Sequence, residues 1–310
     1  MKNTCKSLVI SFGCLIIMLS AINVARADED SKPVSSWEDA ISMVKKTVAF
    51  LGTINPDGTP NYRATAVLLQ IDEVYHIATA KHVVVEVKNG QFTGRLIDND
   101  LYVFFNQSDG RISKRRLHQI KQQMGTEWVF HKNVNVDLAI LPFPIGQSDD
   151  LKVLPEKYFL SQEQLRELQD LFFVSYQPGI PSLDKVRPVY RPATVSVLLP
   201  DKTFYMDGAA FPGNSGSPVF VRPEPVGFSG KTNPVFPAPN SGKFVGLVGE
   251  YLPYQDIAVS GQTGRARIIF EEHTGLSRVW SIDLLKEILN SKECKEQIAR
   301  IKGRVGNWKQ

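Results

Sequence analysis

Short runs of β-branched and aromatic residues, separated by turn-forming sequences, dominate this chain from Thr47 onward. The runs of the first part are TVAFLGTI, ATAVLLQI, VYHIATA, LYVFFN and WVFHKNVNVDLAILPF, with NPDGTPN, KNGQ and NQSDG as turns. The pattern resumes with FFVSYQ, ATVSVLL, TFYM, SPVFV, KFVGLVGEYL and ARIIFEE. Short strands that alternate with regular turns predict an all-β fold of the barrel or sandwich kind.

Two blocks of strands imply two β units joined by a linker. In the linker, Leu165 and Leu168 share one helical face after a capping Ser161, which predicts a helix near residues 161–170. The expected segments are a signal peptide (1–27), an N-terminal segment with a short helix (28–45), a first β-barrel (46–150), a linker with a helix (151–172), a second β-barrel (173–281), and a C-terminal amphipathic helix with a basic tail (282–310).

The N-terminus has the pattern of an export signal. Lys2 and Lys6 precede an apolar run that ends at Ile22, and the small-x-small sequence Ala25-Arg26-Ala27 follows. This pattern predicts a signal peptide cut after Ala27, and therefore a bacterial periplasmic or secreted protein. An uncleaved N-terminal anchor is the alternative, although the run is short against the ~20 residues of a membrane span. No later stretch is long and apolar enough to span a membrane.

Charge and cysteine content limit the partners and the source of stability. Removing residues 1–27 takes away three of the 36 basic residues and none of the 32 acidic ones, so the net charge falls from +4 to +1. Such a balance does not indicate a nucleic-acid partner. Cys294 is the one cysteine left, so no internal disulfide can form and a hydrophobic core must stabilise the fold.

The sequence FPGNSGSPVF, Phe211 to Phe220, places Ser215 between glycines on a tight turn. A serine hydroxyl becomes a nucleophile when a base lies beside it and an acceptor orients that base. His82 fits the base, because it ends a strand-like run with small neighbours, YHIATAKHVV. Asp137 fits the acceptor, because it opens the apolar run DLAILPF, where an unpaired carboxylate would be costly. A strand-start turn residue is the alternative interpretation of Asp137.

The blocks TAKHVV, DLAILPF and GNSGSPV resemble the three catalytic blocks of chymotrypsin/trypsin-like serine peptidases, in the same order along the chain. The bacterial members, such as the glutamyl endopeptidases, are the most similar. The resemblance covers about residues 46–290 and implies two antiparallel six-stranded β-barrels with a C-terminal α-helix. It also implies an enzyme that needs no cofactor and hydrolyses protein or peptide substrates through an acyl-enzyme intermediate.

The resemblance assigns roles to particular residues. Ser215 would attack the carbonyl, His82 would take its proton, and Asp137 would orient His82. The backbone amides of Gly213 and Ser215 would form the oxyanion hole. Asn214 stands where many animal members have the aspartate that binds a newly cut N-terminus, so no activating cleavage beyond signal removal is expected.

The same resemblance places the specificity pocket, whose expected residues are Ala209, Ala210, Val248, Gly249, Glu250 and Tyr251. The pocket base at Ala209 and Ala210 has no charge, so a preference for lysine or arginine is not expected. The histidine and hydroxyl that glutamyl endopeptidases use are replaced by Val248 and Ala210. A small or medium apolar P1 residue is the resulting hypothesis.

Two other classes of function were weighed. A catalytically silent, peptidase-like binding protein would keep the fold but block its cleft, and the inserts at 221–243 and 252–267, expected as surface loops, could do so. A metallo-hydrolase is not favoured, because the histidines lack HExxH spacing and Cys294 stands alone, so no metal site is expected. Of the other histidines, His131 is interpreted as structural and His273 as a loop residue. The oligomeric state stays open.

Overall fold

The computed structural model describes residues 42–223, 227–229, 233–235 and 240–306. The signal peptide, most of the N-terminal segment and much of the 221–243 insert lie outside the described residues. The strands of the first unit are β1 (Val48–Ile54), β2 (Pro60–Ile71), β3 (Val74–Thr79), β4 (Val85–Lys88), β5 (Gln91–Leu96), β6 (Tyr102–Asn106), β7 (Ile112–Arg116), β8 (Val129–Phe130), β9 (Ala139–Pro142) and β10 (Leu154–Pro155).

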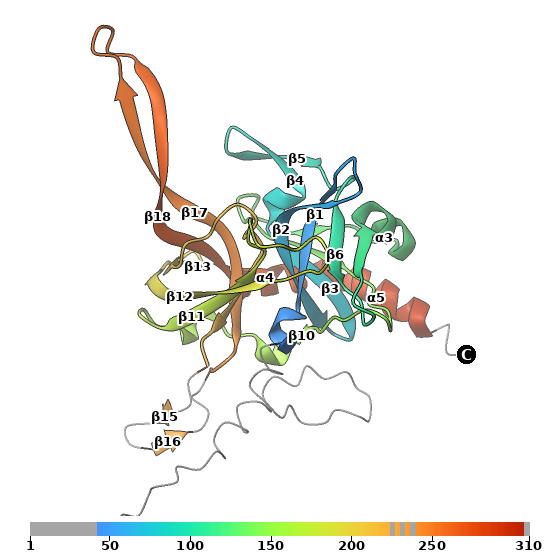
Figure 1. Cartoon of the computed structure of the whole chain (residues 1–310). Coiled ribbons are helices and arrows are strands. Elements are labelled where there is room, and N and C mark those ends of the chain that lie inside the picture. The colour runs from blue at the N-terminus through green and yellow to red at the C-terminus, as the bar shows by residue number, and fades with distance from the viewer. Residues whose placement is uncertain (1–41, 224–226, 230–232, 236–239, 307–310) are drawn as a thin grey trace, which may run out of the picture.

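The first unit is one eight-stranded sheet with the order β7-β6-β1-β2-β3-β9-β8, to which β10 adds in parallel beside β2. β4 and β5 form a separate hairpin that stands above this sheet (Figure 1). The expectation of a closed six-stranded barrel is corrected for this unit, because the hydrogen-bonded path holds seven strands, with β10 off the path, and does not return from β8 to β7. β8 and β10 are each only two residues long, so they are short additions to the longer strands β9 and β2.

The second unit is a closed barrel of six strands in the order β11-β12-β13-β18-β17-β14. The remaining pair, β15 and β16, lies apart from the barrel. The bounds are β11 (Asp170–Ser175), β12 (Val189–Leu198), β13 (Thr203–Asp207), β14 (Pro218–Val221), β15 (Gly227–Ser229), β16 (Asn233–Val235), β17 (Phe244–Val259) and β18 (Ala266–Ser281). The predicted fold class, all-β and chymotrypsin-like with a C-terminal helix, is confirmed.

Burial explains why the central strands read as continuous apolar runs. β3 is buried along nearly its whole length, and β9 and β14 are buried at every residue, so neither face of these strands meets water. The second barrel has its own core, in which Leu171, Phe173, Phe204 and Val245 are fully covered. Burying a side chain of this size contributes about 1.5–3 kcal/mol, so these cores compensate for the missing disulfide.

Within the described ranges the helices are few, and most are short. They are the 3-10 helices η2 (Lys81–Val83), η3 (Glu156–Tyr158) and η4 (Gln162–Gln164), and the α-helices α3 (Leu117–Met124), α4 (Ile282–Leu289) and α5 (Lys292–Gly306). Residues 42–45 are helical in the part of the N-terminal segment that is described. No helix within the described ranges combines the length and apolar character that crossing a membrane requires.

The C-terminal helix is broken in two, with Asn290 and Ser291 between α4 and α5. α4 turns its apolar face into the core, as expected of an amphipathic helix, through Ile282, Leu284, Leu285, Ile288 and Leu289. Cys294 is buried beside them, and burial raises the pKa of its thiol to about 11. α4 therefore packs into the hydrophobic core that residues of both units share.

Two expectations about irregular segments are wrong. The linker has no α-helix at 161–170: only the single turn η4 forms there, and β11 already begins at Asp170. The insert at 252–267 is not a loop, because β17 and β18 continue through it as a long two-stranded hairpin that projects from the barrel (Figure 1).

An aromatic cluster joins the two units. Tyr176, just after β11, packs edge-on against Phe50 and tilted against Tyr62, with ring centroids 5.2 and 5.3 Å apart. The Tyr62 hydroxyl donates to the carbonyl of Ser182 at 2.7 Å. These contacts hold the end of β11 against β1 and β2, which is where the residues of interest meet.

Candidate active site

His82 and Asp137 lie side by side because two neighbouring strands end at the same edge. β3 pairs antiparallel with β9, so that Thr79 faces Ala139. His82 follows β3 in the turn η2, and Asp137 precedes β9 by two residues. The register of one strand pair therefore brings together two residues separated by 55 positions in the sequence.

The two oxygens of Asp137 make two different contacts with His82. Oδ1 accepts the backbone N–H of His82 at 2.8 Å, and Oδ2 lies 2.6 Å from the imidazole Nδ1. An ionised carboxylate can only accept hydrogen bonds, so Nδ1 carries a proton. The other ring nitrogen, Nε2, lies 2.9 Å from Oγ of Ser215. In the neutral ring Nε2 is then an acceptor, and the Ser215 hydroxyl donates to it.

The pKa of His82 is raised above its ordinary value. Burial of the ring works to lower this pKa, but the hydrogen bond and charge of Asp137 outweigh burial, and the charge of Glu250 adds to them. Asp137 itself is 7% exposed, so water screens its charge poorly. The imidazole therefore holds a proton more strongly than a free histidine does.

The turn that carries Ser215 depends on its glycines. Gly213 and Gly216 adopt φ angles of +101° and +80°, which residues with a Cβ rarely adopt. A Cβ on Gly216 would also lie 2.3 Å from the carbonyl oxygen of Thr65. Between them, Asn214 is fully buried: its Oδ1 accepts from the Phe211 amide at 2.8 Å, and its Nδ2 donates to the Tyr176 carbonyl at 2.5 Å.

Thr65, on β2 of the first unit, fastens this turn of the second unit. Its hydroxyl donates to the Gly213 carbonyl at 2.9 Å and accepts the Tyr176 amide at 2.9 Å. Its own amide donates to the Ser215 carbonyl at 3.0 Å. The buried Thr65 thus bonds to Gly213, Ser215 and Tyr176, and these bonds hold Ser215 in place relative to His82. The sequence analysis did not select Thr65.

The carbonyls of Gly213 and Ser215 are held by Thr65, but their amides stay free. Within the described part of the chain, neither N–H donates to a protein acceptor, whereas the Asn214 N–H between them donates to the Phe211 carbonyl at 2.9 Å. Two unpaired amides beside a serine hydroxyl can bind a negatively charged oxygen.

Comparison with known proteins agrees with this geometry. The family model described as a trypsin-like peptidase domain matches residues 64–224, which is more than half of the chain. The chain belongs to the trypsin-like peptidase family. It is therefore a serine peptidase, a hydrolase that acts on proteins.

Two further comparisons were made. No curated protein matches the sequence of this trypsin-like peptidase. Among solved structures, the serine endoprotease from Yersinia pestis is similar, with 14% sequence identity and a TM-score of 0.44. That match covers 85% of this chain and 68% of the other.

The structure of this trypsin-like peptidase places the expected pocket residues unevenly. The side chains of Ala210 and Val248 are 4% and 1% exposed and belong to the core of the second barrel. Gly249 lies next to Ser215, since the Ser215 hydroxyl is 3.3 Å from the Gly249 carbonyl oxygen. A Cβ on Gly249 would lie 2.3 Å from Nε1 of Trp280, so this position has no room for a side chain.

Other members of the expected pocket face outward. Ala209 is half-buried, and Glu250 is exposed with its Oε1 3.6 Å from Nη1 of Arg278. Tyr251 stacks on His273, with ring centroids 4.9 Å apart and planes at 18°. The outward-facing wall is therefore built from paired charges and stacked rings.

The expectation that His273 is a loop residue is wrong. This histidine lies in β18, not in a loop, and its Nε2–H donates to the Ala210 carbonyl at 2.8 Å while its Nδ1 accepts the Gly275 amide at 2.8 Å. Both ring nitrogens are occupied, so His273 supports the wall beside Ser215. Another histidine, His131, pairs with Glu287 at 2.9 Å and has no hydrogen bond with His82, Asp137 or Ser215. No group of histidine, cysteine and acidic side chains among the described residues could hold a metal ion.

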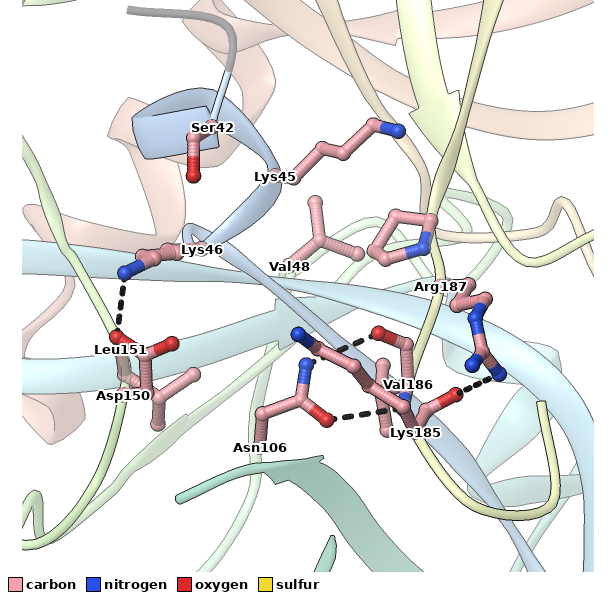
Figure 2. Close-up of a pocket in the computed structure, with 11 residues that line it drawn as sticks. Ser42, Lys45, Lys46, Val48, Asn106, Asp150, Leu151, Lys185, Val186 and Arg187 are labelled. Atoms are coloured by element: carbon pink, nitrogen blue, oxygen red, sulfur yellow. Dashed lines mark hydrogen bonds and ion pairs between the residues drawn. The ribbon is translucent and has the colours of Figure 1, made fainter. Parts of the chain in front are cut away.

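A separate pocket of about 320 Å³ lies between the start of the described chain and the segment before β12 (Figure 2). Several cationic side chains line it, but Lys46 is paired with Asp150 at 2.6 Å. The side chain of Asn106 is occupied by both backbone groups of Val186, each at 2.9 Å. His82 and Ser215 do not line this pocket, so it is distinct from the site described above.

Proposed function

We propose that this serine peptidase cleaves peptide bonds through a triad of Ser215, His82 and Asp137. The observation that carries the proposal is the position of one imidazole between a carboxylate at 2.6 Å and a hydroxyl at 2.9 Å. In the first step Oγ of Ser215 attacks the peptide carbonyl and its proton passes to Nε2 of His82. Asp137 holds the ring in the required tautomer and stabilises the imidazolium that forms.

The reaction would be completed by three further proton transfers. His82 gives its proton to the leaving amine, and an acyl-enzyme ester on Ser215 remains. Water then attacks the ester, His82 takes a proton from that water, and the proton returns to Ser215 as the acid product leaves. The free amides of Gly213 and Ser215 would hold the oxyanion in both halves of the reaction. A donor of this kind is worth about 10²–10³ in rate.

Substrate preference and location complete the proposal. The uncharged positions Ala209 and Ala210 support a small or medium apolar P1 residue, and a cleavage map dominated by arginine or glutamate at P1 would reject this preference. The N-terminal pattern supports export with cleavage after Ala27. Sequencing the N-terminus of the exported form would test that point, with Asp28 as the expected first residue.

Covalent labelling of the active serine is the direct test. A fluorophosphonate probe reacts with a serine hydroxyl only when a neighbouring base activates it. Wild-type protein is expected to become labelled at Ser215, as located by mass spectrometry, and Ser215→Ala is expected to stay unlabelled. Ser217, two residues away and fully buried, provides the matched control, because Ser217→Ala should label like the wild type.

A different labelling result would change the interpretation. Wild-type protein that is folded but unreactive would favour the silent binding protein over the enzyme. Labelling at a serine other than Ser215 would show that the site has been placed wrongly.

The raised pKa of His82 predicts where activity is lost in acid. The general base must be neutral, so activity falls as the pH drops through the pKa of the free enzyme's imidazole. Because Asp137 and Glu250 raise this pKa above the ordinary 6.5, the acid limb of kcat/KM should have its midpoint above 6.5. Glu250→Gln should move that midpoint to lower pH, since one raising charge is removed. A pH–rate profile measures both, and an acid midpoint below 6.5 would contradict the argument.

A further inference from the structure

The hairpin formed by the outer parts of β17 and β18 is unlike the rest of the surface. It extends away from the barrel as a two-stranded arm, and no other strand of the described residues pairs with it (Figure 1). Large apolar side chains on it are 52–62% exposed: Tyr254, Ile257, Val259, Ile268, Ile269 and Phe270. Single exposed apolar residues are ordinary, but a contiguous group marks a surface that binds something.

The pairing register divides the arm into two faces, because directly paired residues of an antiparallel ladder point to the same side. Ile257 pairs with Ile269, and Gln255 pairs with Glu271. Ala258 pairs with Ile268 but Val259 pairs with Ala266, so Arg267 is the extra residue of a β-bulge and lies opposite Val259, which alternates onto the side of Ile257. We call this side, with Val259 at its outer end, the isoleucine face.

The opposite side is the phenylalanine face. Here Asp256 pairs with Phe270, Tyr254 with Glu272, and Ala258 with Ile268. The charged residues on this face, Asp256 and Glu272, are both acidic. Two copies that met through it would bring like charges together, which opposes association.

The isoleucine face has a different charge order. Glu271 lies toward the barrel, the pair Ile257 and Ile269 lies in the middle, and Arg267 lies toward the tip. If a second identical face is laid against it in the opposite direction, each Arg267 meets the other copy's Glu271, and the isoleucines meet at the two-fold axis. Such a surface is complementary to itself, as two-fold interfaces require.

We propose that the arm is a homodimerisation element, and that a second copy of this chain docks on the isoleucine face in antiparallel orientation. A stable dimer usually buries about 800 Å² per partner, more than one face of a short two-stranded arm provides. The association is therefore reversible and depends on protein concentration. It is independent of the proposed catalytic triad.

Sedimentation equilibrium across a concentration series tests the proposal. Wild type is expected to pass from monomer to dimer as concentration rises. Ile269→Asp places two carboxylates at the axis and should raise the dissociation constant by about a hundredfold or more. Phe270→Asp is the matched control, since it changes the next residue, of similar exposure (53% against 62%), on the opposite face. It should dimerise like the wild type.

A charge exchange tests the orientation. Arg267→Glu and Glu271→Arg should each weaken the dimer by about five- to tenfold, because two exposed ion pairs are replaced by repulsion. The double variant should regain most of the wild-type affinity. An unchanged midpoint of thermal unfolding shows that each variant keeps its barrels folded.

Four results would overturn the proposal. The first is a wild type that stays monomeric throughout the series, and the second is equal weakening by Ile269→Asp and Phe270→Asp. The third is a monomer that binds phosphatidylglycerol vesicles through the arm, which would make the occupant a lipid surface. The fourth is a monomer whose arm variants lose activity on casein but keep it on a short peptide, which would make the arm a substrate-binding surface.

Discussion

His82→Ala is expected to lower kcat for a peptide substrate by about 10⁶-fold, because removal of the base leaves Ser215 as an unactivated hydroxyl. The residual rate comes from binding and from the free amides of the turn, which do not depend on the imidazole. KM should change by only a few-fold, since His82 contributes to proton transfer more than to ground-state binding. Steady-state kinetics on a chromogenic peptide, with highly purified protein, measures both constants.

His131→Ala is the matched control for this experiment. His131 also donates to a carboxylate, Glu287, at 2.9 Å, and it is better covered from solvent than His82, at 8% exposure. No serine hydroxyl of the described residues bonds to its ring. Its removal should leave kcat of the folded protein within a few-fold of wild type. Equal losses in the two variants would show that general destabilisation, and not the loss of a base, explains the result.

The three residues of the triad could be selected from the sequence because each has a local signal. Ser215 lies between glycines that a tight turn requires, His82 ends a strand run with small neighbours, and Asp137 is a charge at the start of an apolar run. His82 and Asp137 meet through the strand register in which Thr79 faces Ala139, whereas Ser215 is brought to them by the packing of the second unit on the first. Before the structure, only the family resemblance could indicate that the three residues meet.

Thr65 had no such local signal. It lies in an ordinary strand and acts on Gly213, 148 positions away, so only the packing of one unit on the other reveals it. His273 was missed for a related reason. The segment around it was interpreted as a loop, whereas it continues β18 and brings the ring to the Ala210 carbonyl.

The errors in the fold have physical causes. In the linker, Leu165 is buried but Leu168 is 85% exposed with a φ of 64°, because its amide bonds to the Val195 carbonyl at 2.8 Å and turns the chain into β11. The hydrogen bond between this segment and β12 thus prevailed over the helical pattern of the sequence. In the 252–267 insert, the polar residues and the glycines suggested a loop. The arm has apolar residues on both faces, so it lacks the simple alternation that identifies a half-buried strand.

Asp137→Asn is expected to lower kcat by about 10⁴-fold while leaving the fold intact. The reason lies in the two demands placed on this side chain: Oδ1 accepts the His82 backbone amide, and Oδ2 accepts the Nδ1 proton. An asparagine amide offers one acceptor and one donor, so it can meet only one demand. With its oxygen on the backbone amide, its NH₂ faces Nδ1, and the ring must carry its proton on Nε2, where it can no longer accept from Ser215.

Two measurements separate this cause from simple destabilisation. The acid midpoint of the residual activity should fall, because the hydrogen bond and charge that raise the pKa of His82 are lost. Asp98→Asn is the matched control. Asp98 is 1% exposed, accepts from Trp128 and Lys121 at 2.8 and 2.9 Å, and has no part in the proposed triad. It should reduce the free energy of unfolding and spare kcat. If Asp137→Asn instead keeps kcat within tenfold, the tautomer of His82 does not depend on Asp137, and the roles assigned to these three residues would have to be redrawn.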